Sequence, residues 1–191
     1  MAMLDRLSVE RMGFSDVGDN VLISDRASFY NCSNIKIGNN VRIDDFCILS
    51  AGSGGILIGN HIHIAAYTSL IGGGTIIIMD FGNVSSRVSI FSSNDDYSGS
   101  AMTGPMISAK YTNVTQKDVT VGRHVIVGCG SVILPGVTLA EGAAVGALSL
   151  IRKDCKAFGI YSGVPAKLIA ERMRDLLDLE QKFLDELKQS L

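Results

Sequence analysis

The stretch VGRHVIVGCGSVILPGVTLAEGAAVGALSLI, residues 121–151, carries an aliphatic side chain at every sixth position. These side chains belong to Val121, Val127, Ile133, Leu139, Val145 and Ile151. Six residues suit one short strand and one corner of a triangular coil, in which the first residue of each hexad points inward. A second inward position lies four places on, at Ser131, Val137, Ala143 and Ser149. The stretch therefore predicts an all-β solenoid.

The same spacing returns upstream in sets of three residues, one set to a coil. The sets are Val17, Ile23, Phe29; Ile37, Ile43, Leu49; Ile58, Ile64, Leu70; and Ile78, Val84, Ile90. Six coils result, over residues 17–160. The starts of the first four coils are 20, 21 and 20 residues apart, but 43 residues separate Ile78 from Val121. We therefore expect a loop at about residues 92–118, and so long a loop in a repeat array is usually functional or disordered.

The corners between strands require left-handed backbone conformations, which Gly, Asn and Asp tolerate best. Residues that the spacing places near corners are Asn39, Asn40, Asp80, Gly130, Gly136 and Gly142. His61 and His124 also fall at corners, whereas His63 should project outward from a flat side. The pair Asp44–Asp45 is expected on a flat edge, where solvation or an interface contact is the plain reading and binding of an acceptor or a cation is the alternative.

The two ends of the chain depart from the six-residue period. Residues 161–191 change to a period of 3.6, with Pro165 suited to a first helical turn, and they predict a C-terminal helix. One face of that helix is apolar except at Glu180, and comprises Ile169, Met173, Leu176, Glu180, Phe183, Leu187 and Leu191. A shorter helix at about residues 4–12, within an N-terminal cap of residues 1–16, should cover the open end of the solenoid.

Composition limits the classes of partner. The chain has 191 residues, a formal net charge of -2 and no apolar run long enough for a membrane span, so neither nucleic acid nor a membrane is expected as a partner. Its four cysteines have no metal or disulfide spacing, and the N-terminus lacks a signal peptide. We therefore expect a cytoplasmic protein with reduced thiols and a small-molecule partner.

The hexads, the loop after the fourth coil, and the run GCGSVILPGVTLAEGAAVGALSLI followed by GVPAK resemble the left-handed β-helix hexapeptide acyltransferases. The most similar subgroup is the sugar acetyltransferases of surface-polysaccharide synthesis, related to galactoside and maltose acetyltransferases. The resemblance covers nearly the whole chain. It implies a left-handed parallel β-helix of about six hexapeptide coils with a C-terminal α-helix. It also implies a homotrimer, with acetyl-CoA as co-substrate in a groove between adjacent solenoids and no required metal.

Carried over by position, the resemblance implies a coenzyme A site along one coil edge. The pantetheine arm would run past Gly128, Gly146, Ala147 and Ser149, where small side chains let a ligand approach the backbone. Lys167 of GVPAK, with Arg152, Lys153 or Arg172 nearby, would meet the phosphates. An ordinary solvated face is the alternative for the arginines and for Lys153.

The loop contains the stretch SIFSSNDDYSGSAMTGP, residues 89–105, and it departs from the family pattern. Galactoside and maltose acetyltransferases have a histidine there as general base, and Asp95 takes its place in this chain. A similar Asn-Asp pair occurs in N-acetyltransferases for nucleotide-linked 3-amino sugars, whose amine needs less help from a base than an alcohol does. We expect Asp95 and His63 as catalytic candidates, and Asn94, Asp96 and Tyr97 as residues that bind the acceptor.

The leading functional hypothesis is an acetyl-CoA-dependent sugar O-acetyltransferase in polysaccharide or lipopolysaccharide biosynthesis. N-acetylation of a nucleotide-linked amino sugar is the alternative within the class. A γ-type carbonic anhydrase, which would use His61, His63 and His124 around zinc, and a non-enzymatic scaffold are alternatives of other classes.

Overall fold

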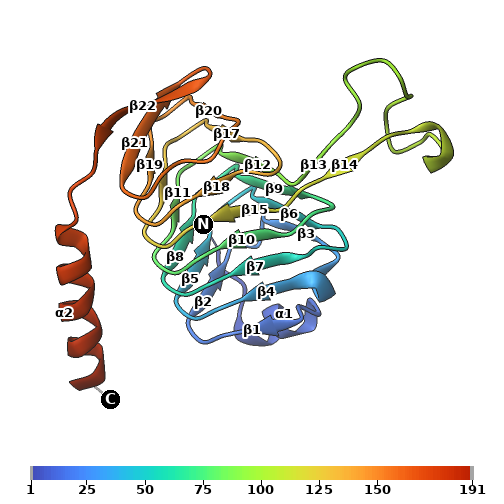
Figure 1. Cartoon of the computed structure of the whole chain (residues 1–191). Coiled ribbons are helices and arrows are strands. Elements are labelled where there is room, and N and C mark those ends of the chain that lie inside the picture. Colours follow the sequence, from blue (N-terminus) through green and yellow to red (C-terminus); the bar gives the residue numbers. More distant parts are fainter. Residues whose placement is uncertain (1, 190–191) are drawn as a thin grey trace.

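The computed structural model describes residues 2–189, and its coils form a triangular prism of three sheets whose strands are parallel except at β22 (Figure 1). The first sheet contains β1 (Asp16–Val17), β4 (Ile35–Ile37), β7 (Ile56–Ile58), β10 (Ile76–Ile78), β15 (Val119–Val121) and β18 (Thr138–Leu139). The second contains β2 (Val21–Ile23), β5 (Val41–Ile43), β8 (Ile62–Ile64), β11 (Asn83–Val84), β16 (Ile126–Val127), β19 (Ala144–Val145), β21 (Gly159–Gly163) and β22 (Ala166–Glu171). The third contains β3 (Ser28–Tyr30), β6 (Ile48–Ala51), β9 (Ser69–Gly72), β12 (Ser89–Phe91), β17 (Val132–Ile133) and β20 (Leu150–Ile151).

The core lies along the axis of the prism and confirms the predicted phase. From Ile37 to Ile151, every residue that the six-residue spacing placed inside is at most 4% exposed. The second inward position is also buried, at Ser131, Val137, Ala143 and Ser149. Six complete coils are present, and β21 adds part of a seventh by pairing in parallel with β19. Each coil therefore buries its aliphatic residues against the coils above and below it.

The corners carry the left-handed residues, as expected. Asn40, Gly130, Gly136 and Gly142 all have a positive φ, and so do His61 and His124. Near Asp80 the left-handed residue is its neighbour Phe81, at φ 61°. We call the turn from the first to the second sheet the first corner, the turn from the second to the third sheet the second corner, and the turn back to the first sheet the third corner.

The N-terminal end is covered by α1 (Arg6–Arg11), which lies inside the range predicted for a helix. Asp5 caps it by accepting a hydrogen bond from the Ser8 N–H at 2.7 Å. Val9 is fully buried against the first coil, so the helix closes the open end of the core.

The C-terminal segment differs from the prediction of one helix over residues 161–191. Residues 159–171 form an antiparallel hairpin of β21 and β22, with Pro165 at its turn rather than in a helix, and only α2 (Asp175–Gln189) is helical. The helical pattern failed here because β21 extends the second sheet, and β22 pairs with the edge that β21 would otherwise leave open. Ile169 and Met173 are exposed outside the helix, and Leu191 lies outside the described residues.

Helix α2 packs on the first corner of the solenoid, where the rings of His61, Phe81 and His124 stack at centroid distances of 4.9 and 5.0 Å. The Phe183 ring meets His61 edge-on at 5.3 Å. Glu180, the one polar residue of the predicted apolar face, is buried and accepts a hydrogen bond from His124 Nε2 at 2.7 Å while also pairing with Arg123. A carboxylate on this face therefore has a structural purpose.

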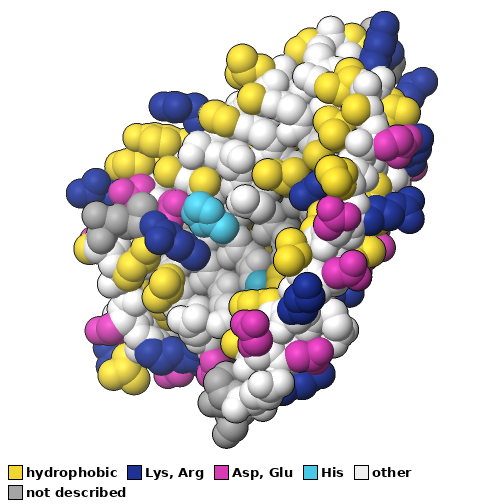
Figure 2. Space-filling model, turned by 90° about the vertical axis from the view of Figure 1, so that its left-hand side faces the viewer, with side chains coloured by type: hydrophobic (Ala, Val, Ile, Leu, Met, Phe, Trp, Pro, Cys, Tyr) yellow, Lys and Arg dark blue, Asp and Glu magenta, His cyan; other side chains and the backbone are white. Residues whose placement is uncertain are grey.

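Figure 2 faces α2 and shows the hollow between the helix and the solenoid, with histidine side chains visible beside it. The hollow is a cavity of about 300 Å³ that includes the three stacked rings of the first corner in its lining. Within residues 2–189 no helix is both long enough and apolar enough to cross a membrane.

Candidate functional site

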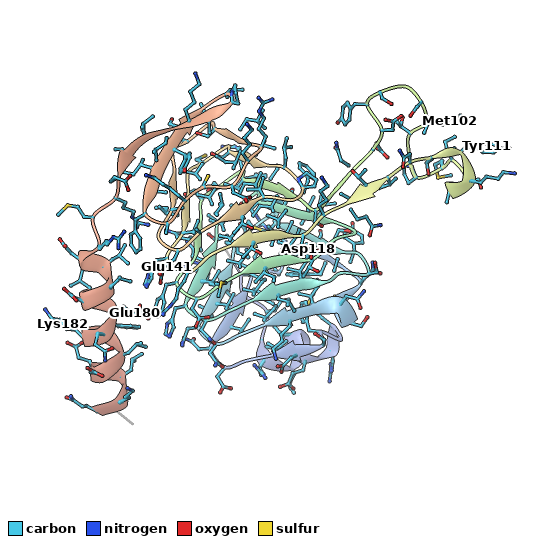
Figure 3. The ribbon with its side chains drawn as sticks, viewed as in Figure 1. Met102, Tyr111, Asp118, Glu141, Glu180 and Lys182 are labelled. Atoms are coloured by element: carbon cyan, nitrogen blue, oxygen red, sulfur yellow. The ribbon has the colours of Figure 1, made fainter. Side chains whose placement is uncertain are left out.

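The insertion after the fourth coil is an ordered arm that leaves the solenoid at the third corner. Its stem pairs β13 (Ser93–Asn94) with β14 (Thr115–Gln116) in antiparallel fashion, and a 3-10 helix, η2 (Ala109–Tyr111), lies near its far end. Buried Ser92 fixes the base of the arm by donating a hydrogen bond from Oγ to the Gly74 carbonyl at 2.6 Å. Figure 3 shows Met102 and Tyr111 far from the solenoid and Asp118 where the chain rejoins it.

The acidic residues of the arm have different roles. Asp96 accepts hydrogen bonds from the Ser98 hydroxyl and backbone, from the Ser100 hydroxyl and from the Ala101 N–H, at 2.7 to 3.0 Å. These bonds, first of all those from Ser98, hold the pKa of the Asp96 carboxyl far below its usual value. Asp96 therefore shapes the arm, whereas Asp95 and Asn94 are exposed. Tyr97 is 87% exposed.

His63 projects from the outer face of the second sheet, as predicted. Its Nε2 lies 2.8 Å from Oδ2 of Asp44, and the other oxygen of that carboxylate accepts a hydrogen bond from Arg42 Nε at 2.7 Å. Burial acts to raise the pKa of Asp44, but the hydrogen bonds and charges of Arg42 and His63 outweigh it and hold this pKa below its usual value. The histidine is therefore oriented by a buried, ionised carboxylate.

Asp44 is the partner of His63 that the sequence reasoning missed, since it was placed on a solvated edge. A usable signal was present, because the coil spacing puts Ile43 directly beside Ile64, and Asp44 follows the first while His63 precedes the second. Neighbours of paired residues in adjacent strands come within reach of each other.

The three histidines do not converge on one point in this chain. His61 and His124 lie in the ring stack beneath α2, whereas His63 faces outward from the second sheet. Among residues 2–189, no cluster of three or more His, Cys, Asp or Glu side chains is arranged to hold a metal ion.

Small residues line the second corner, where the resemblance placed the pantetheine arm. Gly128, Gly146, Ala147 and Ser149 all lie at this corner, in two neighbouring coils. A Cβ on Gly128 would come within 2.5 Å of the Ala147 nitrogen, and one on Gly146 within 2.9 Å of the Ser162 hydroxyl. Coil stacking alone thus requires glycine at Gly128, and Ser162 of β21 crowds Gly146, so the smallness of these residues does not by itself indicate a ligand.

The structure separates the basic residues that the resemblance assigned to coenzyme A. Arg152 and Lys167 line one cavity of about 380 Å³ at the C-terminal end of the solenoid, together with Lys153 and Tyr161. Arg172 lies elsewhere and donates hydrogen bonds to the carbonyls of the first corner, to His124 at 2.8 Å and to Gly142 at 3.0 Å. Arg172 therefore connects the hairpin to the solenoid.

The two catalytic candidates lie on opposite sides of the prism. The arm with Asp95 leaves between the third and first sheets, and the second sheet, which carries His63, forms the side opposite that corner (Figure 1). A single chain does not bring the two side chains together.

A coiled array of hexapeptides interrupted by one long arm defines the class of hexapeptide-repeat β-helix proteins. The chain is 57% identical over 183 residues to the dTDP-4-amino-4,6-dideoxy-D-glucose acyltransferase of Escherichia coli. The aligned region covers 96% of this chain and 95% of that protein. It therefore belongs to the left-handed β-helix hexapeptide acyltransferases, enzymes that use an acyl-CoA as acyl donor.

Solved structures agree with this assignment. AntD, an N-acyltransferase from Bacillus cereus in complex with dTDP and 3-hydroxybutyryl-CoA, matches with a TM-score of 0.93 and 45% identity, covering 97% of this chain and 98% of that chain. Galactoside O-acetyltransferase of Escherichia coli K12 is 38% identical over 53 residues, which are 28% of this chain and 26% of that protein. No protein-family model matches the sequence.

Proposed function

We propose that this enzyme is an N-acyltransferase that transfers an acyl group from acyl-CoA to the amine of a dTDP-linked 4-amino-4,6-dideoxy sugar. The observation that supports this most is the 57% identity, over nearly the full length of both chains, to an enzyme that bears this acceptor in its name. The comparisons thus favour the alternative of the sequence analysis, N-acylation, over the O-acetylation that was expected first.

The chemistry of the arm is consistent with an amine acceptor. All three histidines of the chain lie outside the arm, and exposed Asp95 stands where O-acetyltransferases have their base. An alcohol must lose its proton as it attacks a thioester, whereas a neutral amine is already nucleophilic. A carboxylate at this place is suited to holding the amine in position, and we assign this role to Asp95.

Ser85 is a further candidate. Structures of AntD have been solved with a single substitution at a serine and at an aspartate that lie ten positions apart, and Ser85 and Asp95 have the same separation here. Ser85 lies at the second corner, directly after β11.

We propose that the active site forms between copies of the chain in a homotrimer. Asp95 lies on the arm, whereas Ser85 and His63 lie on or beside the second sheet on the other side of the prism, so one site can combine them only across two chains. The arm exposes Tyr97, Met102, Met106 and Tyr111, of which Met102 and Tyr111 lie at its far end (Figure 3). Such an apolar end is suited to packing on a neighbouring solenoid. In this arrangement Lys167 and Arg152 would bind the phosphates of coenzyme A.

The test measures thiol release from acetyl-CoA and from 3-hydroxybutyryl-CoA with three acceptors. These are dTDP-4-amino-4,6-dideoxyglucose, dTDP-glucose, which keeps the nucleotide but has no amine, and a neutral galactoside. We expect release with the amino sugar alone. Release with the galactoside or with dTDP-glucose in place of the amino sugar would show O-acylation instead. No release with any acceptor would refute the proposed function.

A further inference from the structure

Asp44 and His63 form a pair in which the carboxylate is more buried and more firmly held than in an ordinary surface ion pair. The backbone of Asp44 is fixed by a hydrogen bond from its N–H to the Ile64 carbonyl at 3.0 Å, one residue beyond His63 in the neighbouring coil. The Asp44 side chain is 10% exposed, whereas that of His63 is 42% exposed. The carboxylate is therefore buried behind an imidazole that is open to solvent on its other side.

The position of the proton on His63 follows from its partner. An ionised carboxylate only accepts hydrogen bonds, so Nε2 of a neutral His63 must carry the proton that it donates to Asp44. Nδ1 then bears a free lone pair. The charged groups that face the ring from neighbouring elements are Arg42 on β5 and Asp44 after it, and Asn83 on β11 is its neutral neighbour on the other side. Arg42 pairs with Asp44, so the cluster holds the carboxylate in its ionised form.

We infer that Asp44 is a positioning residue, which holds His63 with Nδ1 free to accept the proton that the acceptor nitrogen loses on becoming an amide. This role rests on the proposed function. In the transfer, the nitrogen attacks the thioester carbonyl, a C–N bond forms and the C–S bond breaks. The excess proton on nitrogen passes to Nδ1 of His63, which then returns it to the departing thiolate. Proton and charge thus balance without a further reactant.

Replacement of Asp44 by Asn gives a specific test, because Arg42 can only donate. The amide oxygen of Asp44→Asn must turn toward Arg42, and its NH₂ group then faces His63. Nε2 has to accept from this NH₂, so the ring proton moves to Nδ1 and the free lone pair is lost. The substitution keeps the size of the side chain and changes which ring nitrogen can accept a proton, as in the tautomer change known from serine protease triads.

Asp45 provides a matched control at the same corner. It is the next residue, but its carboxylate accepts a hydrogen bond from Ser24 and lies 3.9 Å from Arg26, so its partners differ from those of Asp44. Asp45→Asn therefore perturbs the corner by the same chemical change without altering the tautomer of His63.

The experiment combines ring nitrogen spectra with kinetics. In ¹⁵N-labelled enzyme, with the signal of His63 identified by its loss in His63→Ala, we expect the Nε2–H tautomer in the wild type and in Asp45→Asn, and the Nδ1–H tautomer in Asp44→Asn. With the dTDP-linked amino sugar, kcat of Asp44→Asn and of His63→Ala should each fall by about 100-fold with little change in KM. The double variant should be no slower than either single variant.

Three outcomes would overturn the inference. Wild-type kcat in His63→Ala would remove the role of the pair and leave the proposed function intact. A fall in kcat of Asp44→Asn without a change of tautomer would show that Asp44 does not act through His63. Absence of transfer by the wild-type enzyme to every amino sugar offered would refute the proposed function and this role with it.

Discussion

Replacing Glu180 by Ala should release α2 from the solenoid while leaving the solenoid folded. Glu180 is 7% exposed and accepts a hydrogen bond from His124, which is itself 10% exposed, so this bond is shielded from water. A hydrogen bond to a charged group contributes about 1.5–3 kcal/mol. The pair with Arg123, whose side chain is 39% exposed, adds at most about 1 kcal/mol. We therefore expect docking of the helix to weaken by about 2–3 kcal/mol.

Amide hydrogen exchange measures this directly. Each 1.4 kcal/mol is a factor of ten, so protection of the α2 amides should fall by about 30-fold to 140-fold, with that of the coils unchanged. Lys182→Ala serves as control, because Lys182 lies on the far side of the same helix from the solenoid (Figure 3). Unchanged protection of α2 in the Glu180→Ala variant, or an equal loss throughout the coils, would refute the view of Glu180 as a local anchor.

Three further predictions concern the candidate site. Lys167→Ala should raise KM for acyl-CoA with little effect on kcat, as measured by steady-state kinetics. Arg172→Ala should instead lower the melting temperature in a thermal melt, because the two hydrogen bonds of Arg172 join the hairpin to the first corner. Because the pKa of Asp96 is depressed, the stabilisation of the arm by its hydrogen bonds should persist above pH 3.8 and be lost only as the pH falls further. Asp96→Ala should make the arm susceptible to proteolysis at neutral pH without altering the thermal melt of the coils. Finally, co-expression of Asp95→Ala with His63→Ala should recover activity that each variant lacks alone, and failure to recover it would refute a site that combines the two residues across chains.

The buried residues along the axis of the solenoid could be predicted from the sequence, because every coil buries the same kind of aliphatic side chain at the same position. The inward position of Ile78 resembles that of Val121, so a single period describes both, and the long interval between them locates the arm. The hairpin of β21 and β22 could not be predicted, because Ile169 fits the apolar face of a helix in the sequence pattern and is extended only because β21 has an edge to pair. Tertiary context overrode local preference there.

The candidate site was predictable only in parts. His63 was expected to face outward and does, but Asp44 was read as a solvated residue, although the coil spacing already placed it next to His63. The small residues at Gly128 and Gly146 were read as room for a ligand, although the backbone of the next coil occupies the space that a Cβ on Gly128 would need and the Ser162 side chain crowds Gly146. Asp95 and His63 were both expected as catalytic candidates, and a single chain keeps them apart because the arm leaves from the corner opposite the second sheet.

The base of the arm has a consequence for how such enzymes can diversify. The N–H of Lys117 donates to the Ser92 carbonyl at 3.0 Å, so the chain leaves the solenoid and returns at almost the same point. The entropy of closing such an excursion rises only slowly with its length. Coils on either side therefore stack alike whatever lies between these two residues. With the acceptor bound by the arm, as in the proposed function, an arm grafted from a relative with another acceptor should change what is acylated while the coils keep their packing.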